Sequence, residues 1–194
     1  MTAIRLFLLR HGQSLANEQC LIASKPATAQ DAFGLLPLGR AQVRRSLEEA
    51  QGAGLLKPPF RLVSSPLLRA RESIDVAAAL LGVTSTVDPG LSERDFGELE
   101  LKPDDQYEQV WAKDRLDPTH RSWGVQSVAD VLTRAAPVVN GCLGLDDAET
   151  VILCTHGDVA SILLCSSLGE PLGQHREVGA LETGELRELT SRVG

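Results

Sequence analysis

The chain has 194 residues, of which 43% are hydrophobic and 23% are charged, a composition typical of one soluble globular domain. The formal net charge of −7 argues against nucleic acid as a partner, because proteins bind phosphate backbones by neutralising them with lysine and arginine. No apolar run is long enough to span a membrane and the start of the chain does not read as a secretory signal, so we expect no membrane association.

Three short apolar runs predict strands at residues 4–9, 60–64 and 150–155. Such runs are typical of parallel strands that are buried on both faces, although periodicity alone leaves a buried helix open. Residues 178–190 alternate loosely and predict one or two strands that close the sheet. The sequence therefore predicts a largely parallel sheet.

Helical patterns alternate with these strands. We predict a helix over 39–50 and a second over 66–81, with Ser65 as its N-cap, Pro66 as its first residue and Gly82 after its end. A third helix runs from Ser127 toward Leu143, with a capping box at Ser127 and Asp130 and a kink at Pro137. A fourth covers 158–168 and ends at Gly169. This alternation favours an α/β fold in a single domain over residues 1–194. Residues 88–123 are the least regular and predict a binding loop or lid.

Two of the four histidines share one local context. His11 and His156 each follow an apolar strand and precede a glycine and a helical pattern. Because ligands bind beside the carboxyl ends of parallel strands, we expect both imidazoles at one active edge of the sheet. The alternative is that each imidazole merely ends a strand and hydrogen-bonds a carbonyl group.

Two arginines extend this pattern. Arg10 precedes His11, and Arg69 falls in the first turn of a helix, where the helix dipole favours anions. A cation there makes sense if it binds an anion, whereas Arg71 fits a solvated surface side chain. Guanidinium groups bind phosphate oxygens in pairs, and a neutral imidazole can attack phosphorus. These residues therefore predict phosphoryl transfer through a phosphohistidine on His11.

Motifs of other phosphate chemistry are missing from the sequence. It lacks a P-loop, an H-E-x-x-H motif and a His/Asp cluster spaced for two metals, so we expect no metal and no cofactor. Cys154 and Cys165 lie in apolar runs, and no cysteine belongs to a C-x-x-C pair. This favours small buried side chains over a disulfide or zinc site, and a reduced, cytoplasmic protein.

Five segments, in order, resemble the histidine phosphatase superfamily, also called the phosphoglycerate-mutase-like family. They are R-H-G-Q-S-L-A-N at 10–17, L-G-R-A-Q at 38–42, S-S-P-L-L-R-A at 64–70, L-S-E with F-G at 91–97, and T-H-G at 155–157. The resemblance implies a three-layer α/β/α sandwich with a mostly parallel central sheet. It also implies a metal-independent reaction in two steps.

The resemblance implies roles for individual residues. His11 would attack the phosphoryl group, and Glu93 would protonate the leaving alcohol and then activate water. Asp95 is the near alternative to Glu93 as this acid. Binding of the phosphoryl oxygens would fall to Arg10, Asn17, Arg69, His156 and Gly157.

Three sites depart from the family pattern. Gln126 stands where many members have a glutamate, in G-G-E-S. Glu72-Ser73 replaces the common Q-T, which we interpret as variation on a helix surface. Asp158 stands where many members have a small residue, and it would either complement a helix N-terminus or favour the protonated form of His156.

The predicted function is that of a phosphomonoesterase acting on a small phosphorylated metabolite or a phosphopeptide. A phosphoglycerate-type mutase is the alternative, but mutases of this family usually carry a longer, basic insertion, for which only Arg115, His120 and Arg121 could serve here. A third hypothesis is a non-catalytic, phosphate-binding regulatory domain. The acidic lid at 88–123 would select the substrate and disfavours highly anionic ones; the sequence makes no prediction of oligomeric state.

Overall fold

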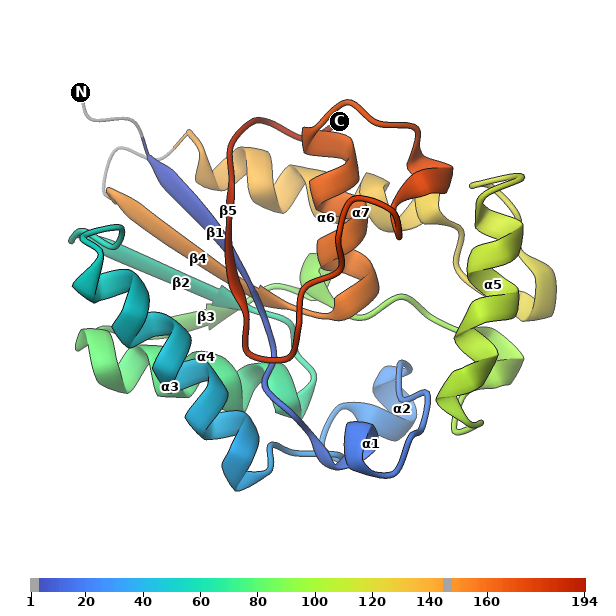
Figure 1. Ribbon diagram of the computed structural model, residues 1–194, viewed down its shortest axis with the longest axis horizontal. Coiled ribbons are helices and arrows are strands. Elements are labelled where there is room, and N and C mark those ends of the chain that lie inside the picture. Colours follow the sequence, from blue (N-terminus) through green and yellow to red (C-terminus); the bar gives the residue numbers. More distant parts are fainter. Residues whose placement is uncertain (1–3, 145–147) are drawn as a thin grey trace.

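A five-stranded sheet forms the centre of the computed structural model, which describes residues 4–144 and 148–194 (Figure 1). The strands are β1 (Arg5–Arg10), β2 (Phe60–Ser64), β3 (Ser85–Val87), β4 (Thr150–Thr155) and β5 (Leu186–Leu189). Their order is β3-β2-β4-β1-β5; the first four are parallel, and β5 runs antiparallel to β1. The expected mostly parallel sheet is therefore confirmed, and the stretch at 178–190 supplies one closing strand.

Helices cover both faces of this sheet (Figure 1). The longer ones are α3 (Pro37–Gly52), α4 (Leu68–Leu81), α6 (Val128–Cys142) and α7 (Gly157–Ser167). Because side chains alternate along a strand, Leu6 and Leu8 of β1 pack in one core with α6 and α7, whereas Phe7 and Leu9 pack in a second core with α3 and α4. The molecule is a three-layer α/β/α sandwich, as the resemblance implied.

The helix starts differ in part from those expected. Ser127 is the N-cap of α6, where its hydroxyl accepts from the backbone N–H of Asp130 at 3.1 Å, and the helix continues through Pro137. By contrast, α4 begins at Leu68 rather than Pro66, with Leu67 as N-cap. The predicted cap at Ser65 is wrong because its hydroxyl lies 2.7 Å from the imidazole Nε2 of His156.

The region at 88–123 is irregular, as expected, apart from one α-helix that the sequence pattern did not reveal and short 3-10 helices at Pro89–Leu91, Gly97–Leu99, Asp104–Gln106 and Ser122–Gly124. Helix α5 (Tyr107–Asp114) packs Tyr107 and Val110 against a small separate core that includes Ile22 and Phe96. Two further short helices, α1 (Leu15–Glu18) and α2 (Pro26–Ala29), follow β1. No helix among the described residues is both long and apolar enough to cross a membrane.

The turn after β1 is held against the start of α3 by two glycines. A Cβ atom on Gly12 would lie 2.2 Å from the carbonyl oxygen of Gly39, and one on Gly39 would lie 2.2 Å from that of Gln13. Both distances are far inside van der Waals contact, so two side-chain-free residues are needed where these backbones meet. This contact fixes the turn that carries His11.

We expect Gly39→Ala to destabilise the fold by about 1–3 kcal/mol, because the added methyl group collides with a backbone oxygen that cannot rotate away. Gly52→Ala, in the same helix, is the matched control, since a Cβ there meets nothing within 4 Å. Alanine should leave this position neutral or slightly stabilised. Urea unfolding measures both, and equal effects would contradict the proposed close approach.

Candidate active site

A cavity of about 370 Å³ opens at the carboxyl ends of β1, β2 and β4. His11 follows β1, Arg69 lies in the first turn of α4 after β2, and His156 is the N-cap of α7 after β4. The three strand ends therefore meet as the sequence predicted. Of the predicted residues, the cavity wall includes Arg10, His11, Asn17, Arg69, Glu93 and Gly157. His156 lies beside this wall and is fully buried.

The ring of His11 is buried and held by its neighbours. Its Nδ1 lies 2.8 Å from the carbonyl oxygen of Gly12, which can only accept, so Nδ1 carries the hydrogen. Its Nε2 accepts from Nε of Arg69 at 3.1 Å. Burial, and then the charges of Arg69 and Arg10, hold the pKa of His11 well below its usual range. The ring is therefore neutral, with a lone pair on Nε2.

Three buried nitrogens around His11 have no hydrogen-bond partner among the described residues. They are Nε of Arg10, Nη1 of Arg69 and Nδ1 of His156. The guanidinium groups are anchored at their other nitrogens, since Arg10 donates to the carbonyl of Leu181 at 2.6 Å and Arg69 to that of Ala23 at 2.8 Å. Unpaired buried donors are costly, so this cluster is built for an anion with several oxygens.

Glu93 is the carboxyl group of this cavity. Burial, and then the charge of Asp158, raise its pKa to about 7, against the opposing effect of Arg69. Asp95, the alternative, points elsewhere. It accepts from the backbone N–H of Gly97, lies 4.0 Å from the ammonium group of Lys25, and is half-exposed. The geometry therefore favours Glu93 as the residue that exchanges protons with a ligand in the cavity.

Asn17 and Gly157 also lie in the cavity wall. The Asn17 side-chain oxygen accepts from the backbone N–H of Ser14 at 3.1 Å and from its hydroxyl at 2.9 Å. Gly157 lies against the guanidinium of Arg10, where a Cβ would come within 3.4 Å of its Cζ. A glycine here lets Arg10 lie across the start of α7.

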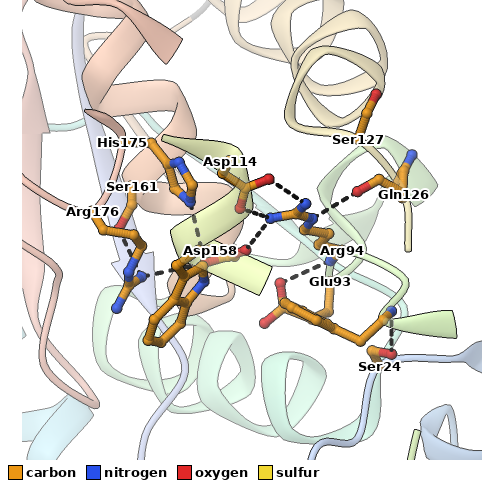
Figure 2. A network of polar contacts seen from close by, with 12 residues as sticks. Ser24, Glu93, Arg94, Asp114, Gln126, Ser127, Asp158, Ser161, His175 and Arg176 are labelled. Atoms are coloured by element: carbon orange, nitrogen blue, oxygen red, sulfur yellow. Dashed lines mark hydrogen bonds and ion pairs between the residues drawn. The ribbon is translucent and has the colours of Figure 1, made fainter. Parts of the chain in front are cut away.

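Beside Glu93, a buried arginine joins the lid to the sandwich. Arg94 is completely buried and binds both carboxylate oxygens of Asp114 at 2.7 and 2.8 Å. It also donates to Asp158 at 3.1 Å and to the carbonyl of Gln126 at 2.7 Å. Figure 2 shows Arg94 between these groups. Sequence reasoning missed this role, although a lone arginine within an acidic segment was the available signal.

Asp158 is part of the same network and does not pair with His156. It accepts from the indole N–H of Trp111 at 2.9 Å and lies 3.3 Å from Arg176. Figure 2 shows Asp158 beside Arg176 and His175. Burial alone would raise the pKa of Asp158, but the nearby His175 and the guanidiniums of Arg94 and Arg176 hold it below its usual range. The idea that Asp158 favours protonation of His156 is therefore not supported by the geometry, since Asp158 organises the opposite wall.

That wall consists of side chains that the sequence did not single out. Tyr107 and Trp111 of α5 stack with ring centroids 5.2 Å apart, and Arg176 stacks over Trp111 at 3.9 Å. The rim adds the exposed acids Asp104 and Asp105. The predicted lid at 88–123 contains these positions except Arg176, but no signal singled out any one of them, because α5 itself was not predicted.

The interpretation of Glu72-Ser73 as surface variation is wrong. Ser73 is buried, accepts from the backbone N–H of Gly12 at 3.1 Å and donates to the carbonyl of Arg69 at 2.7 Å. Glu72 accepts from the backbone N–H of Leu35 at 2.6 Å. Ser73 faces the turn after β1, because the helix face that carries Arg69 also covers that turn, whereas Glu72 holds Leu35, which forms a β-bridge with Ser14. They support the position of His11.

Gln126, at the position where a glutamate is common in the family, holds a second arginine. Its side-chain oxygen accepts from Arg134 at 3.1 Å, and Arg134 also donates to the carbonyl groups of Gly90 and Glu93 at 2.7 and 3.1 Å. Gln126 therefore acts on the backbone that carries Glu93.

Comparisons with known proteins agree with this geometry. A family model described as histidine phosphatase superfamily (branch 1) matches residues 6–192. A curated relative, the probable phosphoglycerate mutase GpmB of Yersinia pestis, is 26% identical over 180 residues, which are 90% of this chain and 80% of that protein.

Solved structures show the same fold. A mycobacterial glucosyl-3-phosphoglycerate phosphatase superposes with a TM-score of 0.80 at 25% identity, covering 97% of this chain and 93% of that one. YhfR of Bacillus stearothermophilus superposes with a TM-score of 0.78 at 22% identity, covering 98% and 95%, and shows likeness of fold alone.

We expect Asp114→Asn to lower the free energy of unfolding by about 3 kcal/mol, because it leaves the buried guanidinium of Arg94 without its bidentate carboxylate. Glu108→Gln, on the same helix, removes an exposed pair with Arg115 and should change stability by less than about 0.5 kcal/mol. Denaturant titration compares the two variants, and a loss in both alike would contradict a special role for the buried pair.

Proposed function

Because the chain belongs to the histidine phosphatase superfamily (branch 1), we propose that it hydrolyses phosphate monoesters through a phosphohistidine on His11. The observation that carries this proposal is the cluster of buried nitrogens without a partner on Arg10, Arg69 and His156, around a neutral imidazole. A dianionic phosphoryl group supplies the acceptors that the two guanidinium groups lack.

The first step forms the covalent intermediate. Nε2 of His11 gives up the hydrogen bond from Nε of Arg69 and attacks phosphorus with its lone pair, and the bond from phosphorus to the ester oxygen breaks. The carboxyl group of Glu93 gives its proton to that oxygen, so an alcohol leaves and a carboxylate remains. Arg10 and Arg69 compensate the charge on the non-bridging oxygens as the bonds change.

The second step reverses these roles. The carboxylate of Glu93 takes a proton from water while the water oxygen attacks phosphorus, and the bond to Nε2 breaks. Inorganic phosphate leaves, His11 is neutral again, and Glu93 is again protonated. A carboxyl group with a pKa of about 7 suits both directions at neutral pH.

A small phosphorylated metabolite suits the cavity better than a phosphopeptide. Its volume of about 370 Å³ is that of a small-ligand site, and Tyr107 and Trp111 of α5 form part of its wall. The mycobacterial relative is named for a phosphorylated sugar acid, glucosyl-3-phosphoglycerate. We propose a phosphate ester of this size class as substrate.

The lid supports hydrolysis over a mutase reaction. The three basic residues that could bind a second acidic group are engaged elsewhere: Arg115 with Glu108, His120 with Asp114 and Arg121 with Asp130. None of the three lines the cavity. Arg176 is the additional cation at its far end, and Asp158 partly neutralises it.

A substrate panel separates the candidate functions. Aryl, sugar, nucleotide and glycerate phosphates would be incubated with the protein in EDTA, with and without a bisphosphoglycerate primer. Release of phosphate from one class supports the phosphatase. Interconversion that needs the primer would establish a mutase, and phosphate binding without any turnover would establish the regulatory domain.

His11→Ala should lower phosphate release by about 10⁴-fold or more, because the covalent step is lost. Arg69→Gln should lower it by about 100-fold, since one fixed charge on the transferred group is removed. Arg71→Gln, two residues along the same helix, is the matched control and should leave the rate unchanged, because Arg71 pairs with Asp31 outside the cavity. Initial rates on an aryl phosphate measure all three; full activity of His11→Ala would contradict the mechanism.

The value of kcat/KM for an alkyl phosphate should fall about tenfold per pH unit above pH 7, because Glu93 then loses the proton that the alcohol needs. His11 adds no loss on the acid side until well below pH 6.5, since its pKa is lowered. Glu93→Gln should abolish the alkaline fall. It should slow an alkyl phosphate by about 100-fold more than a nitrophenyl phosphate, whose leaving group needs no acid.

Asp95→Asn is the control for the assignment of the acid. It should keep both the alkaline fall and the ratio between the two substrates, because Asp95 lies outside the cavity. If Asp95→Asn instead slowed the alkyl phosphate much more than the nitrophenyl phosphate, Asp95 would be the acid.

A further inference from the structure

The Ser65 hydroxyl forms a hydrogen bond with His156, the second histidine of the site. It lies 2.7 Å from Nε2 of His156, and both residues are completely buried. The Ser65 oxygen also lies 3.3 Å from the backbone N–H of Leu67, which can only donate. Because Ser65 is completely buried, solvent does not take up its hydroxyl hydrogen.

Only one placement of the hydrogens on Ser65 and His156 satisfies both side chains and leaves a donor for an anion. A hydroxyl has one hydrogen and two lone pairs. With the Leu67 N–H on a lone pair of Ser65, the hydroxyl hydrogen is free to point to Nε2 of His156. Nε2 then accepts, and in a neutral imidazole the ring hydrogen must lie on Nδ1.

Nδ1 is also the one ring nitrogen left for a ligand. It is buried and has no partner among the described residues, and the His156 ring lies edge to face with that of His11 at 5.1 Å. If the hydrogen lay on Nε2 instead, a lone pair on Nδ1 would be directed at the anion that the two arginines attract. Buried lone pairs facing an anion are repulsive, so the arrangement would work against phosphate.

We propose that Ser65 is a positioning residue that fixes His156 as the Nδ1–H tautomer, so that the neutral ring donates a hydrogen bond to the phosphoryl group on His11. This inference rests on the proposed function, because it assigns the ligand of Nδ1 as a phosphoryl oxygen. The two arginines and His156 then have different roles. Arg10 and Arg69 supply the charge, and His156 supplies a directional neutral donor.

The arrangement also explains why a serine stands between β2 and α4. The hydroxyl of the preceding residue, Ser64, donates to the carbonyl of Ser65 at 2.8 Å and does not contact His156. Two adjacent buried serines therefore have different roles. Ser64 holds the backbone, and Ser65 sets the hydrogen position on a ring that faces the reaction.

The direct test uses the wild-type protein. Long-range proton–nitrogen NMR spectra of protein labelled with ¹⁵N-histidine distinguish the two neutral tautomers of His156, with His156→Gln providing the assignment. We expect the Nδ1–H pattern near pH 7, with and without inorganic phosphate. The Nε2–H pattern in either state would overturn the proposal, whether or not the protein hydrolyses any ester.

Ser65→Ala and Ser64→Ala form a matched pair for function. Ser65→Ala should lose the fixed Nδ1–H pattern, weaken binding of inorganic phosphate by about 10-fold or more, and lower kcat on an aryl phosphate more than it changes KM. Ser64→Ala should keep the wild-type tautomer and kcat. Circular dichroism checks that both variants are folded.

The outcomes separate this inference from the proposed function. An unchanged tautomer in folded Ser65→Ala would overturn the role of Ser65. Phosphate binding and the Nδ1–H tautomer in a protein that hydrolyses no ester would leave the positioning role intact and refute the phosphatase proposal alone.

Discussion

One buried carboxylate, Asp158, joins the sandwich to its lid. It stands in the first turn of α7, two residues after His156, and it contacts Arg94, Trp111 and Arg176. A charge removed from water must be paired, so the lid, which carries Arg94 and Trp111, and the segment that carries Arg176 have to close on α7. The same charge raises the pKa of Glu93. Asp158 therefore helps to shape the cavity, and after burial it is the second cause of the raised pKa of the cavity's acid.

Near Asp158, the site keeps two imidazoles and two guanidinium groups in different protonation states within a small volume. Burial beside Arg10 and Arg69 keeps both imidazoles neutral, and carbonyl groups rather than carboxylates hold the two arginines. Carboxylates paired directly with these arginines would compete with a phosphoryl group. The carboxylate that acts most on both arginines, Glu93, is not hydrogen-bonded to either of them, so the guanidinium groups keep free donors for a ligand.

The supporting residues act through hydrogen bonds to backbone and ring nitrogens. Ser73 holds the turn that carries His11, and Glu72 holds the neighbouring segment at Leu35. Gln126 acts through Arg134 on the backbone of Glu93. These contacts explain why positions that depart from the family pattern are compatible with an intact site. A change at such a position alters how a functional side chain is held rather than which chemistry it performs.

The sequence alone determined the layers and the chemical centre. Apolar runs placed the strands, and a residue just after a parallel strand must lie at the ligand-binding edge, so His11, His156 and Arg69 could be brought together without coordinates. Glu93 was identified through resemblance, because an acid in an irregular segment carries no periodic signal. Only the tertiary structure revealed α5, Arg94 and the ring partner of Ser65. Their roles depend on contacts between residues 20 to 91 positions apart, and local pattern carries no information about which distant groups burial will force to pair.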